Sequence, residues 1–491
     1  MQSDTGKTNL AKNAAYNVIY KLLNILFPLI TAGYIARVLS PLGVGRSFVV
    51  QNNVSYFVIF AVLGIPAYAI REIAKVREDT RATSKLFSEM VVLNAVLTTV
   101  SVLVFTVCIL SIDYFHKELT LHLIYGITIL INYINIDWYY QAVEDYRFIA
   151  IRSTAVKFVS LIAVFVFVHK PDDLYLYALI YSLANCGHYF INVLRIRKRV
   201  SFTLKELELS RHLKSLIFLT LYVISIEVYA KMDITMVGIL DGEIEVAFYT
   251  YAQRVINLII TFVIAITAVF MPRLSFYYAH DRKEFYKLTK FGVDLMVFMS
   301  IPICLGIVSI AAPLVRIWLG ADFEKTIPCM IVLAFIIPLK CIGDLAGFQV
   351  MMCSGEELKL VIPHFIALFI NFILNYFMIP RWGALGASIA SLITEICIIV
   401  LVLILTLKVH HYGLNVRNLI TVTVSSVLMF AAVVFIVRMI QPALPGMILG
   451  IITGIVVYIG INVLLHNTFL VNDLLRRIKG VMKDEGAEEK A

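Results

Sequence analysis

The sequence predicts an all-helical protein that crosses a membrane many times. Of its 491 residues, 60% are hydrophobic and only 15% are charged, and the mean hydropathy is +0.87. A soluble protein carries about 25% charged residues, and so apolar a chain can hide its surface only in a bilayer. No polar stretch exceeds roughly twenty residues, so the chain leaves no room for a large soluble domain.

The membrane spans follow from the apolar windows of the chain. About fourteen windows reach the roughly 20 residues that a helical span requires. The expected spans are 13–36, 47–70, 87–111, 119–141, 149–168, 174–194, 213–240, 246–271, 291–314, 327–352, 360–380, 384–407, 418–437 and 444–466.

The positive charges predict the orientation of these spans. Lysine and arginine gather in the loops after the second, sixth and eighth spans and in the C-terminal tail, while the opposite loops are short and poor in them. Because positive loops stay on the cytoplasmic side, both termini are expected in the cytoplasm of a multi-pass membrane protein. The net charge of +9 therefore reflects topology, and nucleic acid is not an expected partner.

An internal repeat indicates how the spans are grouped. The segment GVGRSFVVQNNVSYFVIFAVLGIPAYAIREIA can be laid without gaps over EVAFYTYAQRVINLIITFVIAITAVFMPRLSFY, which places Arg71 on Arg273. The two segments are six spans apart and therefore run in the same direction, as in transporters built from parallel repeats. We expect a pseudo-twofold pair of six-helix lobes with additions: 1–195 (first lobe), 196–212 (basic cytoplasmic hinge), 213–408 (second lobe), 409–466 (two extra spans) and 467–491 (cytoplasmic tail).

Polar side chains inside spans one, two, seven and eight predict a binding cavity. They recur at intervals of three and four, which places them on one face of each helix, and an ionisable group inside a span is a functional candidate. A net positive cavity suits a phosphate-bearing substrate, which Arg binds bidentately and Lys binds as a point charge. The predicted lining residues are Asn17, Lys21, Asn24, Arg46, Gln51, Lys231, Gln253, Arg254 and Asn257.

Other charged residues predict how transport is driven. No ATP-binding loop, cofactor motif, metal spacing or catalytic constellation is present in the sequence, so we expect a transporter rather than an enzyme. The drive would be an H⁺ or Na⁺ gradient, the membrane potential or consumption of the product. The coupling candidates are Glu227, Asp233 and Glu395. Ion pairs four residues apart are also expected for Glu227 with Lys231 and for Lys340 with Asp344.

The stretch NYINIDWYYQAVEDYRFIAIRS gathers aromatic and charged side chains at the turn between the fourth and fifth spans. Its aromatic residues suit a membrane interface, and its acids can pair locally with its arginines. Two readings stay open: a structural elbow, or a gate whose ion pairs lock one state.

Four segments resemble one family. AGYIARVLSPLGVGR (32–46), GIPAYAIREIAKVRED (64–79), IDWYYQAVEDYRFIAIRS (136–153) and LNYFMIPRWGALGASIASLITE (374–395) are similar to polysaccharide repeat-unit flippases of the Wzx type, within the multidrug/oligosaccharidyl-lipid/polysaccharide exporter superfamily. The resemblance implies two six-helix lobes around a cationic cavity. It also implies positioning or gating roles for Arg71, Glu72, Asp137, Gln141, Glu144 and Arg152. Arg273, the repeat counterpart of Arg71, is expected to share such a role.

The resemblance also implies a function. It is the transfer of an undecaprenyl-pyrophosphate-linked oligosaccharide of O-antigen, capsule or exopolysaccharide type between membrane leaflets by alternating access. The implied partners are membrane lipid, this lipid-linked oligosaccharide, a polysaccharide polymerase and a chain-length regulator. The alternatives are a lipid II flippase, a drug/cation antiporter of the same superfamily, and a membrane-bound polysaccharide polymerase or ligase. The short outer loops argue against a polymerase or ligase, and the cationic residues argue against the antiporter.

Overall fold

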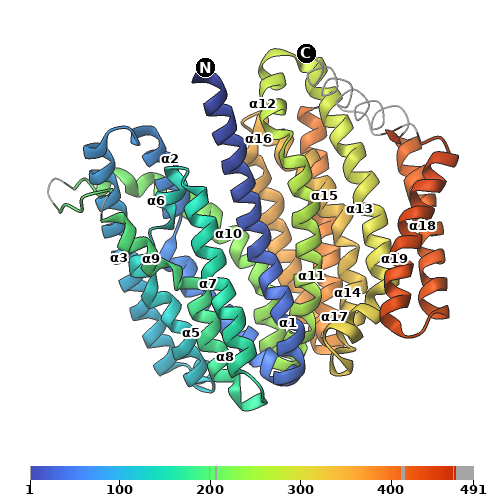
Figure 1. Ribbon diagram of the computed structural model, residues 1–491, viewed down its shortest axis with the longest axis horizontal. Coiled ribbons are helices and arrows are strands. Elements are labelled where there is room, and N and C mark those ends of the chain that lie inside the picture. Colours follow the sequence, from blue (N-terminus) through green and yellow to red (C-terminus); the bar gives the residue numbers. More distant parts are fainter. Residues whose placement is uncertain (1, 198, 205–206, 411–414, 468, 471–491) are drawn as a thin grey trace. The chain divides into compact units, whose positions relative to one another are not determined.

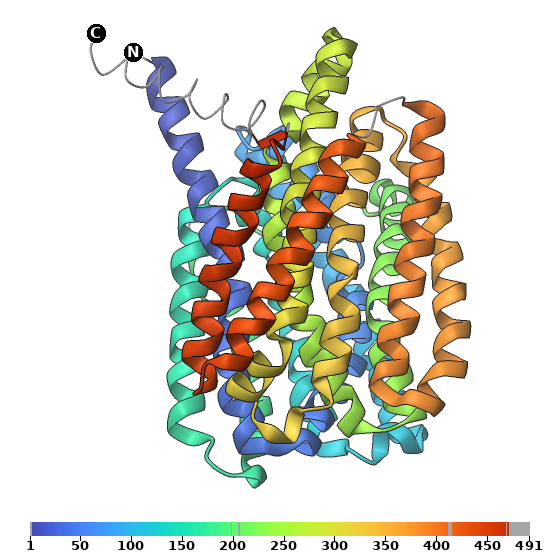
Figure 2. The same cartoon turned by 90° about the vertical axis from the view of Figure 1, so that its right-hand side faces the viewer.

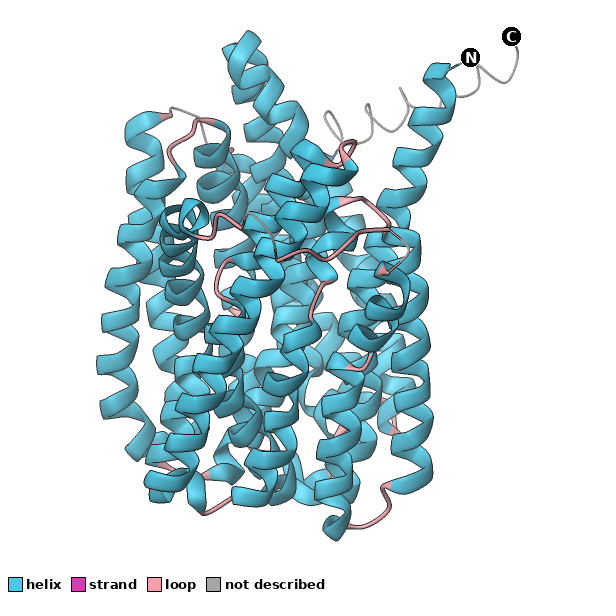
Figure 3. Cartoon of the chain, turned by 90° about the vertical axis from the view of Figure 1, so that its left-hand side faces the viewer, coloured by secondary structure: helices cyan, strands magenta, loops and turns pink. Residues whose placement is uncertain are grey.

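The computed structural model describes residues 2–197, 199–204, 207–410, 415–467 and 469–470, with side chains from Leu29 onward apart from 213–215, 217–226, 229 and 409. Within these ranges every regular element is a helix, as the sequence predicts, and Figure 3 shows short loops between them. By its packing the chain divides into two units, Met1–Gly238 (unit 1) and Ile239–Ala491 (unit 2). This division does not test the predicted limits of the lobes, hinge, extra spans and tail, which stay a prediction.

Unit 1 is a bundle in which α1 lies beside α5 and α7, and α2 lies beside α6 (Figure 1). Its elements are α1 (Gln2–Val62), α2 (Ile65–Val76), α3 (Thr80–Ser111), α4 (Asp113–His116), α5 (Leu119–Ile131), η1 (Asn132–Ile134), α6 (Asp137–Ala142), α7 (Tyr146–Phe167), η2 (Pro171–Asp173), α8 (Leu174–Cys186), α9 (His188–Ile196) and α10 (Ser210–Leu240), whose last two residues begin unit 2.

Unit 2 is a second bundle, in which α18 packs against both α13 and α19 (Figure 2). Its elements are α11 (Glu243–Ala268), α12 (Met271–His280), α13 (Arg282–Trp318), η3 (Ala321–Phe323), α14 (Thr326–Ala334), α15 (Ile336–Gly343), η4 (Asp344–Gln349, a π-helix), α16 (Val350–Cys353), η5 (Glu357–Leu360), α17 (Val361–Val409), α18 (Val416–Met439) and α19 (Ala443–Leu464).

The helices are long and apolar enough for a polytopic membrane protein. Among the described residues, nine helical stretches qualify as membrane spans, and Leu119–Ile134 is a shorter apolar one. Two of the nine, Leu29–Val76 with 48 residues and Glu357–Lys408 with 52, are about twice the length of one span. The predicted count of fourteen stays a prediction.

Local sequence explains why α1 is really two helices. Ser40 takes a left-handed φ of 59° with an extended ψ of 170°. The following residue is Pro41, whose ring disfavours a helical conformation at the residue before it. The chain therefore breaks between the first and second predicted spans. A second break at Leu63 and Gly64, both with positive φ, ends the second span earlier than expected and starts α2.

Glycine allows the corresponding break in α17. Gly383 has a φ of 55° and a ψ of −132°, which an L-residue with a Cβ rarely adopts. A Cβ at this position would also meet the carboxylates of Asp241 and Glu245. Glu245 Oε2 accepts a hydrogen bond from the backbone N–H of Ala384 at 3.1 Å, so the carboxylate helps to start the second half of α17.

Helix caps reveal the repeat between the two units. Asp79 accepts hydrogen bonds from the second and third backbone N–H groups after it and starts α3, and Asp281 starts α13 in the same way. These caps lie in the register that aligns Arg71 with Arg273. Each cap follows a helix, then a break, then a short helix with proline in its first turn, namely α2 or α12. The two units therefore repeat this order of elements at the positions that the sequence repeat aligns.

Candidate functional site

A glutamine at the same repeat position organises a polar contact in each unit. In unit 1, Gln51 donates to the hydroxyls of Ser47 and Tyr125, each at 3.0 Å, and these two hydroxyls are 2.6 Å apart. In unit 2, Gln253 donates to the Tyr249 hydroxyl at 3.4 Å, and this hydroxyl lies 3.0 Å from Ser391 Oγ. Gln51 therefore joins α1 to α5, whereas Gln253 contacts Tyr249 of its own helix α11, and it is Tyr249 that reaches Ser391 on α17.

The cationic residues predicted for the cavity differ in their surroundings. Arg46 is tied to Glu118 by two hydrogen bonds, from Nε to Oε1 and from Nη2 to Oε2, each of 2.7 Å. Its charge is thus balanced inside unit 1. Arg254 is half-buried on α11, and Asn257, three residues on, is exposed. The predictions on Asn17, Lys21 and Asn24 lie outside the residues whose side chains the structure describes.

A polar cluster joins α1 and α10 in unit 1. Asn52 Nδ2 donates to Thr235 Oγ1 at 2.7 Å and to the Lys231 carbonyl at 3.3 Å, and the Tyr56 hydroxyl lies 2.9 Å from Thr235 Oγ1. The expected pair between Lys231 and Glu227 is formed, with 3.9 Å between Nζ and Oε2. We call Asn52, Tyr56, Lys231 and Thr235 the α10 polar cluster.

Both members of the Lys231–Glu227 pair keep solvent contact. The Lys231 side chain is 26% exposed and the Glu227 side chain 43% exposed. Asp233, the other coupling candidate on α10, is buried. The α10 polar cluster thus brings two hydroxyls and an amide together, a set suited to a hydroxyl-rich ligand. Lys231 enters it through its backbone carbonyl, while its ammonium group pairs with Glu227.

The expected pair of Lys340 with Asp344 is wrong. Lys340 Nζ instead lies 3.0 Å from Oε1 of Glu395, a coupling candidate whose side chain is 8% exposed. Asp344 begins the π-helix η4, in which a residue lies over the fifth one along rather than the fourth. Gln349 Nε2 accordingly donates to Asp344 Oδ2 at 2.8 Å. The π-helical winding accounts for the contact between Asp344 and Gln349, while Lys340 is paired with Glu395 of α17.

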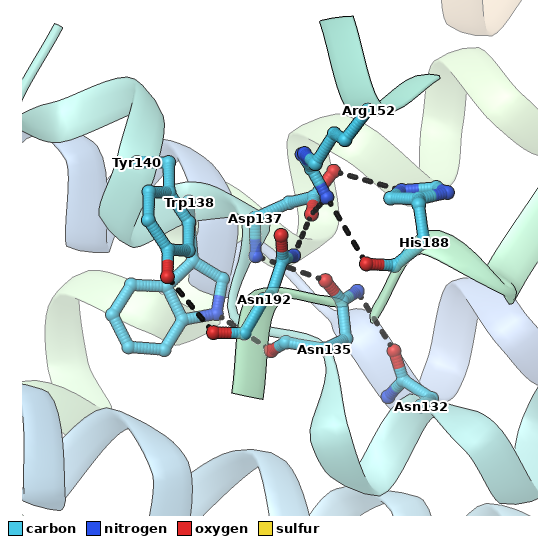
Figure 4. A network of polar contacts seen from close by, with 8 residues as sticks. All are labelled: Asn132, Asn135, Asp137, Trp138, Tyr140, Arg152, His188 and Asn192. Atoms are coloured by element: carbon cyan, nitrogen blue, oxygen red, sulfur yellow. Dashed lines mark hydrogen bonds and ion pairs between the residues drawn. The ribbon is translucent and has the colours of Figure 1, made fainter. Parts of the chain in front are cut away.

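The elbow stretch folds around one buried carboxylate, shown in Figure 4. Asp137 starts α6, and side chains from α7 and α9 point towards it. Arg152 Nη1 lies 2.9 Å and Asn192 Nδ2 2.5 Å from its Oδ1, and His188 Nε2 lies 3.1 Å from its Oδ2. Asn135 Oδ1 accepts a hydrogen bond from its backbone N–H at 3.3 Å. Asp137 thus fastens α6 to two other helices.

The electrostatics of Asp137 follow from these contacts. Asp137 lies beyond the break that ends α5, outside the candidate spans. Burial by itself raises the pKa of Asp137, but hydrogen bonds and charges from His188 and Arg152 outweigh burial and lower the pKa to about 2. The carboxylate is therefore ionised and compensates the guanidinium of Arg152, whose side chain is only 2% exposed.

The aromatic residues of the elbow are packed inside unit 1. Trp138 Nε1 donates to the Asn135 carbonyl at 3.1 Å, and the Tyr140 hydroxyl donates to the Asn192 carbonyl at 2.8 Å. Both side chains belong to a buried apolar cluster, so they do not form an interfacial belt as expected. This packing agrees with the elbow reading; the gating reading stays a prediction.

The remaining gating candidates lie near the surface. Glu144 pairs with Arg77 at 3.1 Å, and Glu72 pairs with Arg71 at 2.9 Å and with Lys75 at 2.9 Å. Gln141 is half-buried, and Arg273 is exposed on α12. Sequence reasoning missed His188 and Asn192 as partners of Asp137, although two polar residues four apart in an otherwise apolar segment are a visible signal.

A match to a protein family covers the first part of the chain. A family described as polysaccharide biosynthesis protein matches residues 10–278, more than half of the chain. The chain belongs to this polysaccharide biosynthesis protein family. The resemblance read from the four sequence segments is thus confirmed.

Relatives of this polysaccharide biosynthesis protein are named as transporters. A protein of Escherichia coli (strain K12) called "Putative O-antigen transporter" is 21% identical over 397 residues, which cover 80% of this chain and 95% of the relative. A protein of the same name from Shigella flexneri is 24% identical over 411 residues, covering 78% and 94%. These names describe transport and not an enzymatic activity.

Solved structures share the fold. The lipid II flippase MurJ in an inward closed conformation aligns with a TM-score of 0.76 at 15% identity, covering 95% of this chain and 100% of that one. An inward-facing multidrug resistance transporter of the MATE family, from the MOP superfamily, aligns with a TM-score of 0.56 at 15% identity, covering 81% and 94%. The chain therefore shares the overall fold of these two solved structures.

Proposed function

We propose that the chain moves an undecaprenyl-pyrophosphate-linked oligosaccharide repeat unit from the cytoplasmic to the periplasmic leaflet of a bacterial inner membrane. The observation that carries the proposal is the match over 80% of the chain to a protein named as an O-antigen transporter. The cargo would be a unit of O-antigen, capsule or exopolysaccharide type.

One cation in each unit is a candidate for binding the pyrophosphate. Lys231 on α10 and Arg254 on α11 are both half-buried. A charged residue inside a membrane span costs free energy, so its presence marks it as a functional candidate. Each can recognise a phosphate group, because Lys attracts its charge and Arg offers two parallel N–H donors.

The α10 polar cluster would bind the first sugars. The Asn52 amide donates to the Thr235 hydroxyl at 2.7 Å, and the Tyr56 hydroxyl lies 2.9 Å from the same Thr235 hydroxyl. Such groups exchange hydrogen bonds with sugar hydroxyls without a net charge change. Translocation would then proceed by alternating access of the two repeats, with the lipid tail left in the bilayer and no covalent step.

An ion gradient or the membrane potential would drive the cycle. Glu227 and Asp233 lie on the same helix as Lys231 and are the nearest carboxylates in its sequence, so they are the first coupling candidates. Glu395 is a weaker candidate because Lys340 already compensates its charge. Both termini would lie in the cytoplasm. A polymerase and a chain-length regulator would act on the transferred unit at the periplasmic side.

One alternative is a lipid II flippase, which the fold of MurJ favours at a TM-score of 0.76. Lipid II also carries a pyrophosphate and sugars on a polyprenyl tail, so the same cations would serve it. The named relatives favour the repeat-unit cargo, and the two functions differ in which lipid-linked intermediate accumulates when the protein is missing.

The test is leaflet-resolved accumulation of undecaprenyl-linked oligosaccharide in a deletion strain. The strain is complemented with the wild type, Lys231→Ala, Arg254→Ala or the charge-preserving Arg254→Lys. We expect build-up on the cytoplasmic side without the protein, no rescue by either alanine variant at normal membrane levels, and partial rescue by Arg254→Lys.

Lys287→Ala is the matched control, because Lys287 is an exposed residue paired with Glu284 on the surface of α13. It is expected to rescue fully. Accumulation of lipid II in place of the repeat unit would favour the alternative cargo. Normal translocation combined with blocked polymerisation would refute the transporter proposal in favour of an enzyme. Full rescue by both alanine variants would refute the cation assignment alone.

A further inference from the structure

A second buried polar cluster lies at the start of α10. The Tyr68 hydroxyl of α2 is 2.7 Å from Nδ1 of His212, and His212 Nε2 is 2.8 Å from Oε2 of Glu89 on α3. The three residues are 6%, 4% and 3% exposed for Tyr68, Glu89 and His212. We call this chain of three side chains the linker clamp.

The clamp ends a longer set of contacts between α3 and the segment that precedes α10. In the described residues 199–204 and 207–209, here called the linker, three backbone N–H groups donate to side chains of α3. The pairs are Ser201 to Ser84 Oγ at 3.3 Å, Thr203 to Ser88 Oγ at 3.0 Å and Glu208 to Glu89 Oε1 at 2.8 Å. Glu89 thus holds the linker through one oxygen and His212 through the other.

The surroundings of the clamp are apolar on one side and charged on the other. Tyr68 and Leu216 belong to the same buried apolar cluster. The charged groups that face the clamp come from all three elements around it: Arg71 and Glu72 on α2, Lys85 on α3, and Glu208 and Arg211 beside His212. Lys85 and Glu208 pair with each other at 2.7 Å, and Glu72 is paired with Arg71 and Lys75.

The imidazole of His212 can keep both contacts in either protonation state. When neutral, it accepts from the Tyr68 hydroxyl at Nδ1 and donates to Glu89 from Nε2. When a solvent proton binds at Nδ1, the ring donates at both nitrogens, and the Tyr68 hydroxyl turns to become the acceptor. The protonated ring also gains a direct charge attraction to the Glu89 carboxylate, which is strong because both groups are shielded from water.

The linker clamp lies at the start of α10, the helix that carries Lys231. His212 is the third residue of α10, and the same helix carries Glu227 and Lys231. A change in how the linker is held therefore acts at the start of the helix that bears the proposed pyrophosphate-binding lysine.

We propose that Tyr68, Glu89 and His212 form a proton-binding site, and that protonation of His212 tightens the docking of the linker on α3. Its role in transport rests on the function proposed above. Binding of a proton and docking of the linker favour each other, since coupling between two binding events is reciprocal. An imidazole suits this purpose because its charge changes between about pH 5 and 8.

The test is hydrogen–deuterium exchange of the purified full-length protein at about pH 6 and about pH 8, on either side of the imidazole range. Rates in peptides covering the linker are corrected for the intrinsic pH dependence of amide exchange. We expect protection of the linker to be on the order of fivefold greater at the lower pH, the small end of typical coupling between two sites.

Two variants make the result specific. His212→Gln keeps an N–H donor for Glu89 but cannot titrate, so the pH dependence is expected to vanish. Glu89→Gln keeps an acceptor for the Glu208 N–H and removes the charge attraction, with the same expected loss. His188→Gln, which changes a half-buried histidine of unit 1 that also pairs with a carboxylate, is expected to retain the wild-type dependence.

Equal protection of the wild type at the two pH values would overturn the proposal, and so would an unchanged pH dependence in His212→Gln or Glu89→Gln. The exchange measurement needs no substrate. A negative exchange result therefore does not affect the transport proposal, and a negative leaflet assay does not affect the proposal of a proton-binding site.

Discussion

Removal of the Asp137 charge is expected to destabilise unit 1 strongly. In Asp137→Asn the shape of the side chain is kept, but Arg152 is left with a buried charge that nothing compensates, at a side-chain exposure of 2%. Removal of one partner from a buried ion pair costs about 3–5 kcal/mol. Because the Asp137 side chain is itself 16% exposed, we expect a loss of about 3 kcal/mol in the free energy of unfolding.

The pKa of Asp137 gives an independent magnitude. Its pKa is lowered from 3.8 to about 2, which corresponds to about 2 kcal/mol of stabilisation of the ionised form. Because the pKa is lower in the folded protein, this stability is present above about pH 4 and is lost as the pH falls towards about 2. The difference in stability between wild type and Asp137→Asn should shrink over the same interval.

The assay is denaturant-induced unfolding of the purified protein, followed by tryptophan fluorescence. Trp138 lies next to Asp137, and replacing Trp318 and Trp382 by phenylalanine makes it the reporter of unit 1 in both proteins. Glu144→Gln serves as the control, because Glu144 and Arg77 are 50% and 44% exposed and such pairs contribute about 0–1 kcal/mol. An Asp137→Asn protein within about 0.5 kcal/mol of wild type would refute the account of the network.

Four further substitutions test the fold by thermal unfolding. Gly383→Ala should destabilise by about 1–3 kcal/mol because of its positive φ, and an unchanged midpoint would contradict the helix break. Asp79→Ala and Asp281→Ala should each cost about 0.5–2 kcal/mol as lost helix caps; no effect from either would argue against the capping contacts. Tyr125→Phe should cost about 1–3 kcal/mol by leaving a buried partner unpaired, and a neutral result would mean that this contact adds no stability.

The architecture could be predicted because it depends on patterns along the chain. Apolar windows give the helices, and the serine before Pro41 and the glycine at 383 explain where two long helices divide. The ends of the helices were less predictable than their existence. The second span was expected to reach residue 70, but positive φ angles at Leu63 and Gly64 end the helix at Val62. Periodicity alone does not register such a break, because apolar residues continue through it.

The partners of charged residues were harder to predict than the helices. The spacing of Lys340 and Asp344 fits an ion pair on an α-helix. In the structure Lys340 pairs with Glu395, and the π-helix that begins at Asp344 brings Gln349 to Asp344. Arg46 finds Glu118, which is distant in sequence, and no pattern along the chain indicates that contact. The repeat was easier to predict than these contacts. Asp79 and Asp281 cap their helices in the same way at matching positions.

The central claim is that the chain translocates a lipid-linked oligosaccharide repeat unit. The most direct measurement uses the purified protein in liposomes that contain undecaprenyl-pyrophosphate-linked oligosaccharide, and follows how much of the oligosaccharide becomes accessible on the opposite leaflet. The account predicts transfer by the wild type and by Lys287→Ala, with strongly reduced transfer by Lys231→Ala. Transfer no faster than in protein-free liposomes, under an imposed H⁺ or Na⁺ gradient and membrane potential, would contradict it.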